Sequence, residues 1–302
     1  MDTKLFVRKQ KGGMFSVINK EECPGSIFYV NSATGTDAVG YGKNPDAPFD
    51  SIAYAFSSDV LTSNAGDWII VAPGHAEAVI AAGTITCDIA NVRIIGQPVN
   101  GSKRPTITFT TADTATVVMS AASVTWENFI FVGDIDALAV GFPVTAAYCG
   151  FKNCEFQDAG ADNSLHWISL SAAADDFLLE GCINKGTDTA GNTGFITIAA
   201  ASNVTIKGLR SNGDFSAGNI VFTAAATDLL IADCFLENKN AVDVNIEGFA
   251  GITGWIARNC CMVVTDGEVT WINTPGNSSL YENYGVNAVG ETGMIIGTAS
   301  TT

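Results

Sequence analysis

A short pattern of apolar, charged and turn-forming positions recurs along this chain. The stretch Val124–Phe129 reads apolar, any residue, apolar, charged, turn-former, apolar. Clear copies begin at residues 149, 177, 204, 229 and 255, and weaker copies begin at residues 92 and 279. The turn residue of each copy follows the previous one by 24 to 32 positions. A recurring period of this size predicts a solenoid, in which each repeat packs on its neighbours.

The pattern also predicts the path of the backbone within each repeat. Val124 and Trp126 are two residues apart, so they face the same side of a strand. The next apolar residue, Phe129, breaks this alternation, which requires a bend at Asn128. Asn, Gly and Asp tolerate the left-handed backbone of a one-residue bend. The predicted turn residues are Gly96, Asn128, Asn153, Gly181, Gly208, Asp233, Asn259 and Asn283.

Equivalent positions form columns when the repeats are stacked about 4.8 Å apart, the spacing of neighbouring strands. The outer column alternates in sign wherever it carries charge, as side chains in contact between coils should: Glu127, Lys152, Glu180, Lys207, Ala232, Arg258 and Glu282. The inner column is predicted to be Phe129, Cys154, Cys182, Leu209, Cys234, Cys260 and Tyr284. These columns predict an all-β fold, a single-stranded right-handed parallel β-helix of about eight coils.

The chain divides into four predicted parts. Residues 1–25 form a basic N-terminal arm, and residues 26–66 form a cap that includes a short helix within residues 50–60. The β-helix covers residues 67–287, with the helix sealing its open end against edge-to-edge growth. Residues 288–302 form a tail with a short apolar strand, which we expect either to cap the last coil or to add to a neighbour's sheet edge.

Composition agrees with a cytoplasmically made solenoid. Charged residues make up 15% of the chain and hydrophobic residues 47%, and no run of 18 apolar residues predicts a membrane span. The first residues lack the apolar core of a signal peptide. Five of the eight cysteines fall in inward columns, which predicts reduced thiols acting as small hydrophobic residues: Cys149, Cys154, Cys182, Cys234 and Cys260. Their spacing predicts no metal site, and no cofactor is expected.

Charge is distributed unevenly along the chain. The net charge is −16, which argues against nucleic-acid binding because phosphate contacts need Lys and Arg. Five of the fifteen basic residues nevertheless lie within the first twenty positions: Lys4, Arg8, Lys9, Lys11 and Lys20. A basic arm on an acidic body favours docking to another protein, whereas the simpler alternative is a frayed terminus.

Several N-terminal motifs indicate a family. They are Tyr29-Val30-Asn31-Ser32, Gly35-Thr36-Asp37, Pro48-Phe49, Ser51-Ile52, Gly66-Asp67 and Val71-Ala72-Pro73-Gly74. Their order resembles the N-terminal segment of the pectate-lyase-like superfamily of right-handed parallel β-helix proteins. Together with Gly12–Phe15, Pro73–Glu77 and the Ala/Thr-rich coils, it is similar to a group of bacteriophage virion proteins. This resemblance implies a place on a virion, and a homo-oligomer such as a trimer.

No catalytic residue is predicted. The carboxylate pairs Asp134/Asp136, Asp158/Asp162 and Asp175/Asp176 fall at coil corners, where Asp commonly forms turns. Asp162, Ser164 and His166, taken to lie on one strand, would stand in a row and could not form a catalytic relay. His75 is expected to anchor the turn after Pro73-Gly74. A lyase of the resembled family would need a basic residue and usually a calcium cluster, and no Asp group with an adjacent Arg occurs here.

These observations favour a non-enzymatic structural protein of a phage particle. We expect it to decorate or cement the capsid, made in the host cytoplasm and docked to the major capsid protein or another virion protein through the arm. The alternative is a tailspike-like protein that binds or depolymerises a host glycan. A third hypothesis is a glycan-binding adhesin without catalysis.

Overall fold

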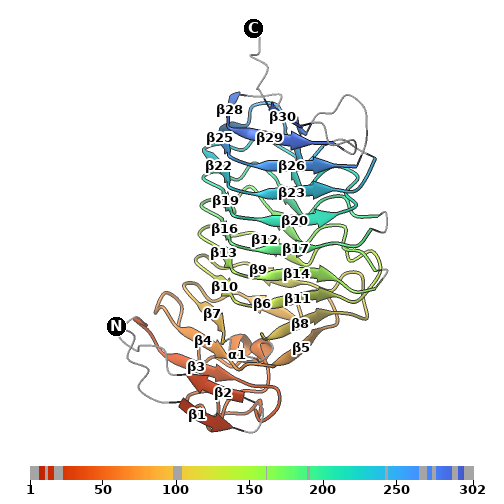
Figure 1. The fold of residues 1–302 in the computed structure, drawn as a ribbon. Coiled ribbons are helices and arrows are strands. Elements are labelled where there is room, and N and C mark those ends of the chain that lie inside the picture. The colour runs from red at the N-terminus through yellow and green to blue at the C-terminus, as the bar shows by residue number, and fades with distance from the viewer. Residues whose placement is uncertain are drawn as a thin grey trace.

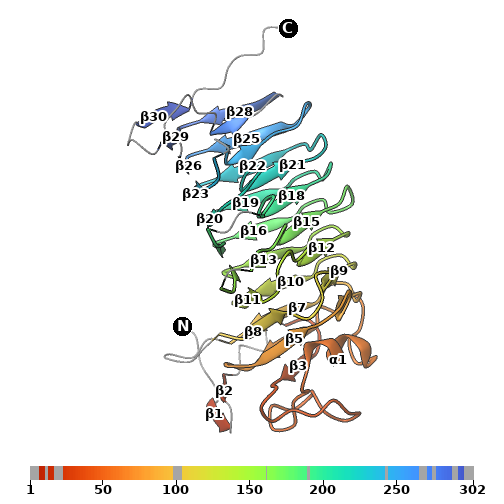
Figure 2. The ribbon, with the colours of Figure 1, turned by 90° about the vertical axis from the view of Figure 1, so that its right-hand side faces the viewer.

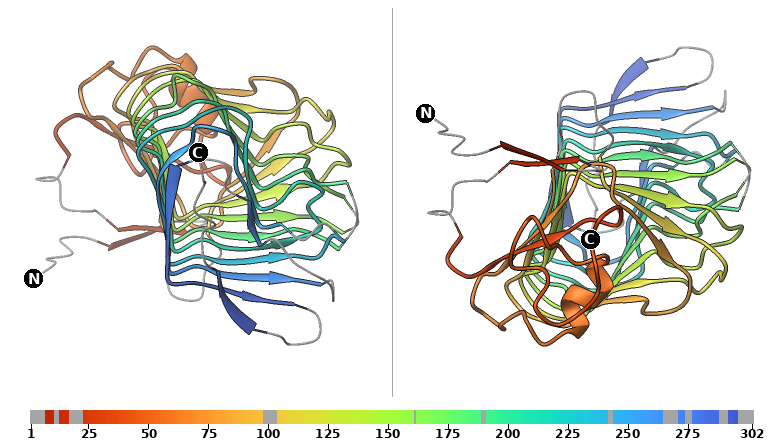
Figure 3. Two further views of the ribbon diagram at one scale, coloured as in Figure 1. Left: turned by 90° about the horizontal axis from the view of Figure 1, so that it is seen from above. Right: turned by 90° about the horizontal axis from the view of Figure 1, so that it is seen from below.

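The computed structural model describes residues 7–10, 13–16, 23–97, 104–160, 162–188, 191–241, 244–264, 271–273, 277–287 and 292–295. It forms a solenoid of about eight coils, each of which contributes one strand to each of three parallel sheets (Figures 1 and 2). Viewed along the axis, the three sheets enclose the core (Figure 3). The predicted right-handed parallel β-helix is therefore confirmed.

Sheet one contains the strands that lead into the predicted turns. In chain order they are β3 (Ile27–Val30), β4 (Trp68–Val71), β7 (Arg93–Gly96), β10 (Thr125–Glu127), β13 (Gly150–Lys152), β16 (Leu178–Glu180), β19 (Thr205–Lys207), β22 (Leu229–Ala232), β25 (Thr253–Ala257) and β28 (Asn277–Tyr281).

Sheet two begins just after each turn. Its strands are β5 (Ala76–Val79), β8 (Thr106–Phe109), β11 (Ile130–Gly133), β14 (Glu155–Asp158), β17 (Ile183–Lys185), β20 (Arg210–Gly213), β23 (Phe235–Asn238), β26 (Cys260–Val263), β29 (Asn283–Val286) and β30 (Thr292–Ile295). The last of these, β30, is antiparallel to β29 of the same chain. Of the two roles expected for the tail, the structure shows the capping of the last coil.

Sheet three closes each coil with short strands. They are β6 (Ile85–Cys87), β9 (Val117–Met119), β12 (Phe142–Val144), β15 (Ile168–Leu170), β18 (Ile196–Ile198), β21 (Ile220–Phe222), β24 (Ile246–Glu247) and β27 (Ile272–Asn273).

The N-terminal end of the solenoid is covered by helix α1 (Ile52–Ser57), which contacts β3 and β6. Ser51 caps this helix by accepting a hydrogen bond from the Tyr54 N–H. Ile52 and Phe56 are buried in the main core, so the helix shields the apolar residues of the first coil. Further towards the N-terminus, β1 (Val7–Gln10) and β2 (Gly13–Ser16) form an antiparallel hairpin within the predicted arm.

The interior is packed with stacked aromatic rings in the middle coils. Trp126 contacts Phe129 and Phe131 edge to face, with ring centroids 5.0 and 5.7 Å apart. Phe142 lies 4.6 Å from Phe131 and 4.9 Å from Phe151 by the same measure. Such pairs add to the stability that burial alone provides, so ring contacts as well as strand pairing hold the middle coils together.

Five predicted turn residues have the expected left-handed backbone: Asn128, Asn153, Gly181, Gly208 and Asp233. The prediction is wrong for Gly96, which is not among the residues with positive φ, and for Asn259 and Asn283. In the last two coils the left-handed residues are Arg258 (φ 56°) and Glu282 (φ 51°). The strand register explains this, because Ala232 pairs with Ala257 and Asp233 therefore lies beside Arg258.

This one-residue shift also corrects the columns. The register Glu127, Lys152, Glu180, Lys207, Ala232 is confirmed, but Arg258 and Glu282 belong to the turn rather than to the outer column. Asn259 and Asn283 take the predicted inner places of Cys260 and Tyr284. The Asn259 amide is satisfied there, since it accepts from the Cys234 N–H at 2.9 Å and donates to the Ile231 carbonyl at 3.0 Å.

All eight cysteines are free thiols. Cys149, Cys154, Cys182 and Cys234 are buried as predicted, whereas the prediction is wrong for Cys260, which is partly exposed beside the buried Cys261. Burial raises the pKa of Cys234 to about 12, because an apolar interior disfavours the thiolate. These core thiols are thus poor nucleophiles.

Candidate functional site

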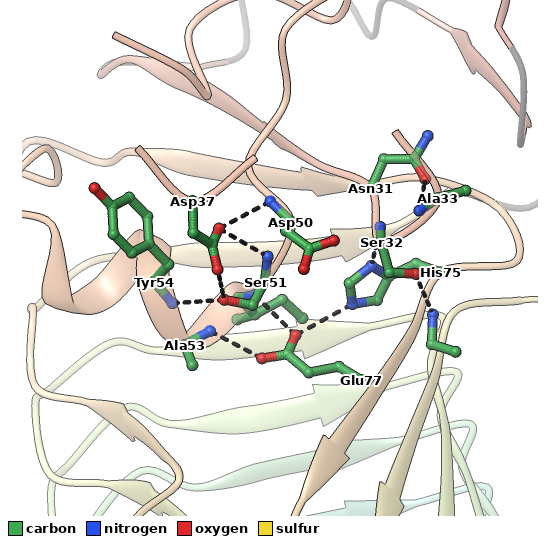
Figure 4. Close-up of polar contacts among 12 residues, drawn as sticks. Asn31, Ser32, Ala33, Asp37, Asp50, Ser51, Ala53, Tyr54, His75 and Glu77 are labelled. Carbon is green, nitrogen blue, oxygen red and sulfur yellow. Dashed lines mark hydrogen bonds and ion pairs between the residues drawn. The ribbon is translucent and has the colours of Figure 1, made fainter. Parts of the chain in front are cut away.

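A polar network joins the N-terminal cap to the first coil (Figure 4). The Glu77 carboxylate accepts hydrogen bonds from the Ile52 N–H at 2.8 Å and the Ala53 N–H at 3.0 Å, at the start of α1. Asp37 accepts from the Asp50 and Ser51 N–H groups at 2.8 and 3.1 Å. Glu77 of β5 therefore ties the helix to the solenoid, whereas Asp37 ties the start of the helix to the connection that follows β3.

Within this network, His75 lies between Ser32 and Glu77 but cannot serve a serine nucleophile. Its Nδ1 accepts a hydrogen bond from the Ser32 backbone N–H at 3.0 Å, so the proton resides on Nε2, which lies 3.1 Å from the Glu77 carboxylate. The Ser32 hydroxyl instead accepts from the Ala76 N–H at 3.0 Å. No ring nitrogen is left to receive a hydroxyl proton, and the predicted turn-anchoring role of His75 is confirmed.

The predicted carboxylate pairs lie where coils turn between sheets two and three or three and one. Asp136 accepts from the Asn163 side chain at 3.1 Å, and Asp175 accepts from the Ser202 N–H at 2.7 Å. Each side chain thus links neighbouring coils, as expected of turn-forming residues.

Asp158, the last residue of β14, is a partly buried carboxylate. Burial raises its pKa to about 6, although hydrogen bonds from Ser164 and Asn192 act in the opposite direction. The Ser164 hydroxyl donates to Asp158 at 2.7 Å rather than to His166. Asp162, Ser164 and His166 lie in the connection between β14 and β15, so the expectation that they share one strand is wrong.

An open groove of about 310 Å³ lies on the outer face of sheet two, over β17, β20 and β23. Its lining residues are Ile183, Asn184, Lys185, Arg210, Ser211, Asn212, Phe235 and Glu237. Side chains alternate between the two faces of each strand, which explains which residues face the groove. The middle residues Asn184, Ser211 and Leu236 are buried, and the residues on either side of each of them face outward. The groove therefore presents cationic, aromatic and amide side chains together.

Two outward columns form this groove. One runs through Glu155, Ile183, Arg210 and Phe235, and the other runs through Gln157, Lys185, Asn212 and Glu237. The guanidinium of Arg210 lies over the Phe235 ring, 6.0 Å from its centroid. This cation–π contact orients Arg210 without neutralising it.

Charge in the groove contrasts with the acidic chain. Glu155 forms ion pairs with both Arg104 and Lys185, so its negative charge is balanced. Arg210 and Glu237 make no ion pair with the residues that the structure describes. The lining of the groove thus holds two cations, Lys185 and Arg210, and one carboxylate, Glu237.

The sequence pattern did not predict this groove, because the predicted columns end one residue past each turn. The signal lies two and four residues past each left-handed residue, where Arg210 and Asn212 follow Gly208 and where Phe235 and Glu237 follow Asp233. A second error concerns Trp255. It begins the copy of the pattern at residue 255, at the position equivalent to Val124, which predicts an inward side chain, but Trp255 is 57% exposed.

The predicted docking arm is only partly covered by the structure. Arg8 and Lys9 lie in β1, whereas Lys4, Lys11 and Lys20 lie outside the described residues. Among the described residues, no helix is long and apolar enough to cross a bilayer.

Comparison with protein-family models gave no match, and comparison with curated proteins gave none either. Among solved structures, the chain is similar to a rhamnogalacturonan lyase, with a TM-score of 0.49 and 12% identity over 86% of this chain and 87% of that one. It is also similar to the GH136 lacto-N-biosidase from Eubacterium ramulus, with a TM-score of 0.40 and 12% identity over 86% of this chain and 67% of that one. At this identity the likeness concerns the fold alone.

These neighbours correct one expectation from the sequence. All the solved structures found carry the name of an enzyme, a lyase or a biosidase, which contradicts the expectation that the chain is not an enzyme. We therefore withdraw that expectation. The parallel β-helix fold holds, but nothing found supports a phage origin or a capsid role.

Proposed function

We propose that this protein binds an acidic glycan, one whose sugar residues carry carboxylates, in the groove over β17, β20 and β23. The observation that carries the proposal is the position of Arg210. Its guanidinium lies over the Phe235 ring and has no carboxylate partner among the described residues. An exposed guanidinium can bind a carboxylate through two parallel hydrogen bonds.

The surroundings of Arg210 supply the other contacts that a sugar acid needs. Phe235 is 36% exposed and offers apolar surface beside the Arg210 guanidinium for a sugar ring. Asn212 and Glu237 line the same groove, where the Asn212 amide nitrogen provides a donor and the Glu237 carboxylate provides an acceptor for hydroxyl groups. The net charge of the protein is −16, but an anion in the groove interacts mainly with the positive charges close to it. More distant surface charges have little effect, because salt screens them beyond about 8 Å at physiological ionic strength.

The arrangement of carboxylates bears on the chemistry of any cleavage. Hydrolysis by paired carboxylates requires them to be about 5–9.5 Å apart. Glu155 and Glu237 stand three coils apart, about 14 Å along the axis at 4.8 Å per coil. Glu155 is also held by two cations. Glu237 is therefore the candidate base for a β-elimination, in which it takes the proton from the carbon next to the carboxylate that Arg210 holds. The bond from the next ring carbon to the glycosidic oxygen then breaks, a double bond forms between the two carbons, and water gives a proton to the leaving oxygen.

Calorimetric titration tests the proposal. The probes are a hexasaccharide of galacturonic acid and a neutral glucose hexasaccharide, and the variants are Arg210→Ala and Lys207→Ala. Lys207 is an exposed cation of the same coil on sheet one, which makes it a matched control. We expect the wild type to prefer the acidic sugar. Arg210→Ala should weaken binding about ten-fold, because a charge-assisted hydrogen bond contributes about 1.5–3 kcal/mol.

Equal affinity of the wild type for both sugars, or equal losses in the two variants, would contradict the proposal.

Incubation of the acidic sugar with wild type and Glu237→Gln, followed by chromatography of the products, tests the role of Glu237. We expect chain shortening by the wild type and its loss in the variant.

The predicted attachment to a virion through Lys4, Arg8, Lys9, Lys11 and Lys20 stays a prediction, as do the oligomeric state and the location on a capsid. Glycan binding is the function that the described residues favour. It agrees with the alternative prediction from the sequence, a protein that binds or depolymerises a glycan.

A further inference from the structure

The outward column that carries Phe235 continues to the C-terminal end of sheet two. Phe235 pairs with Cys260 of β26, and Cys260 pairs with Tyr284 of β29. Two aromatic side chains therefore stand in one column with a single small residue between them. At 4.8 Å per coil, their backbones are about 10 Å apart along the axis.

Tyr284 is 50% exposed although it belongs to a regular strand of the sheet. Its neighbours in the strand, Asn283 and Gly285, are buried, so alternation directs the tyrosine outward. Trp271 packs beneath Gly285, within 2.2 Å of where a Cβ at that glycine would lie. Trp271 therefore packs against the inner side of β29, opposite the side on which Tyr284 is exposed.

The two ends of this outer face differ in chemistry. Towards the N-terminus, Glu155 lies between Arg104 and Lys185. Towards the C-terminus, the column presents Phe235 and Tyr284, and β30 then ends the sheet beside β29. A ligand lying along the axis would meet charged groups at one end and aromatic rings at the other.

We propose that a glycan lies along the solenoid axis, across the strands of sheet two, with one sugar ring on Phe235 and a second ring on Tyr284. This inference rests on the proposed function, because it extends the groove of Arg210 by two coils. It assigns Tyr284 as a residue on which a sugar ring stacks. Only an oligosaccharide longer than the groove can reach it. Affinity should therefore rise with the length of the oligosaccharide.

The test compares Tyr284→Ala with Tyr281→Ala. Tyr281 is 51% exposed and three residues away, but it lies on β28 of sheet one, so it controls for the loss of an exposed tyrosine. Binding of galacturonic acid oligosaccharides of two and six residues is measured by calorimetry, after thermal melting has shown that both variants fold. Tyr284→Ala should weaken binding of the hexasaccharide about five-fold, the scale of one aromatic contact, and leave the disaccharide unchanged.

The outcomes separate the two proposals. If the wild type binds neither oligosaccharide, the proposed function is wrong and this inference fails with it. If Arg210→Ala weakens binding but Tyr284→Ala binds both lengths as the wild type does, the groove stands and the path to Tyr284 is wrong. Equal losses in Tyr284→Ala and Tyr281→Ala would also overturn the assignment of Tyr284.

Discussion

The guanidinium of Arg258 donates two hydrogen bonds to the carboxylate of Asp233 in the preceding coil, at 2.7 and 3.0 Å. Both residues have a left-handed backbone, with φ of 56° and 57°. The pair therefore joins two successive bends between sheets one and two. Hydrogen bonding to Arg258 also lowers the pKa of Asp233, because it favours the ionised carboxylate. The bends of these neighbouring coils are therefore in register with one another, as the paired strands are.

The stacked bends predict the effect of substitution at Asn128. Its φ of 64° is unfavourable for residues with a Cβ, and asparagine tolerates it better than alanine does. Asn128→Ala should lower the free energy of unfolding by about 1 kcal/mol, whereas Asn128→Gly should change it by less than about half of that. Chemical denaturation measures both. Equal stability of Asn128→Ala and the wild type would contradict a left-handed bend at this position.

Glu77 should matter for stability because it holds the start of α1 by two backbone hydrogen bonds. Its side chain is 8% exposed and also contacts His75. Glu77→Ala should lower the free energy of unfolding by about 2–3 kcal/mol, the range for hydrogen bonds to a charged group. Glu127→Ala is the control, since Glu127 forms a more exposed ion pair with Arg93 and should contribute less than about 1 kcal/mol. The account is wrong if the two variants melt at the same denaturant concentration.

Asp158 should make stability depend on pH. Its pKa is about 6 in the folded protein because of burial, against about 3.9 in an unfolded chain. Since the folded pKa is raised, the favourable contribution is complete below about pH 4 and is lost as the pH rises to about 6. The loss is about 2–3 kcal/mol.

Asp158→Asn removes this dependence and keeps the shape of the side chain. The amide oxygen can still accept from Ser164, and the Asn192 oxygen, which has no partner among the described residues, can accept from the new amide after a flip. The measurement is the difference between the unfolding free energies of variant and wild type from pH 4 to 7. We expect it to rise in favour of the variant, and a difference that does not change with pH would contradict a buried carboxyl.

The cysteines predict the pattern of chemical labelling. Cys260 is partly exposed on the outer face of sheet two, whereas the other seven thiols are buried. A maleimide should therefore label Cys260 first in the native protein and all eight thiols after denaturation. Mass spectrometry of the labelled peptides checks this, with Cys260→Ser as control. Faster labelling of Cys261 than of Cys260 would contradict the described register of β26, because it would show that Cys261 faces outward and Cys260 faces the core.

The fold could be predicted from the sequence because one strand-to-turn pattern repeats in every coil. Val124, Trp126 and Phe129 already define two sheet faces and the bend between them. The shift at Arg258 could not be predicted, because Asn259 matches the preference for a turn residue while its amide is in fact satisfied inside. Pattern alone does not reveal which hydrogen bonds a side chain finds.

The groove was harder to predict for a different reason. Arg210, Phe235 and Glu237 resemble ordinary exposed residues in the sequence, and none belongs to a recognisable motif. Their significance lies in the register between coils, which brings Arg210 beside Phe235 and leaves it without a carboxylate partner in the part of the chain that the structure describes. The one-residue bends set that register. If a bend is predicted one position too early or too late, alternation along β23 places Phe235 in the core instead of on the outer face.

The most direct test of the proposed glycan groove is a crystal structure of the protein with a galacturonic acid hexasaccharide. The account predicts a sugar carboxylate within hydrogen-bond distance of the Arg210 guanidinium, a ring against Phe235, and the chain running across β20 and β23 towards Tyr284. A sugar bound instead on the outer face of sheet one or sheet three, with Arg210 free of contact, would contradict it.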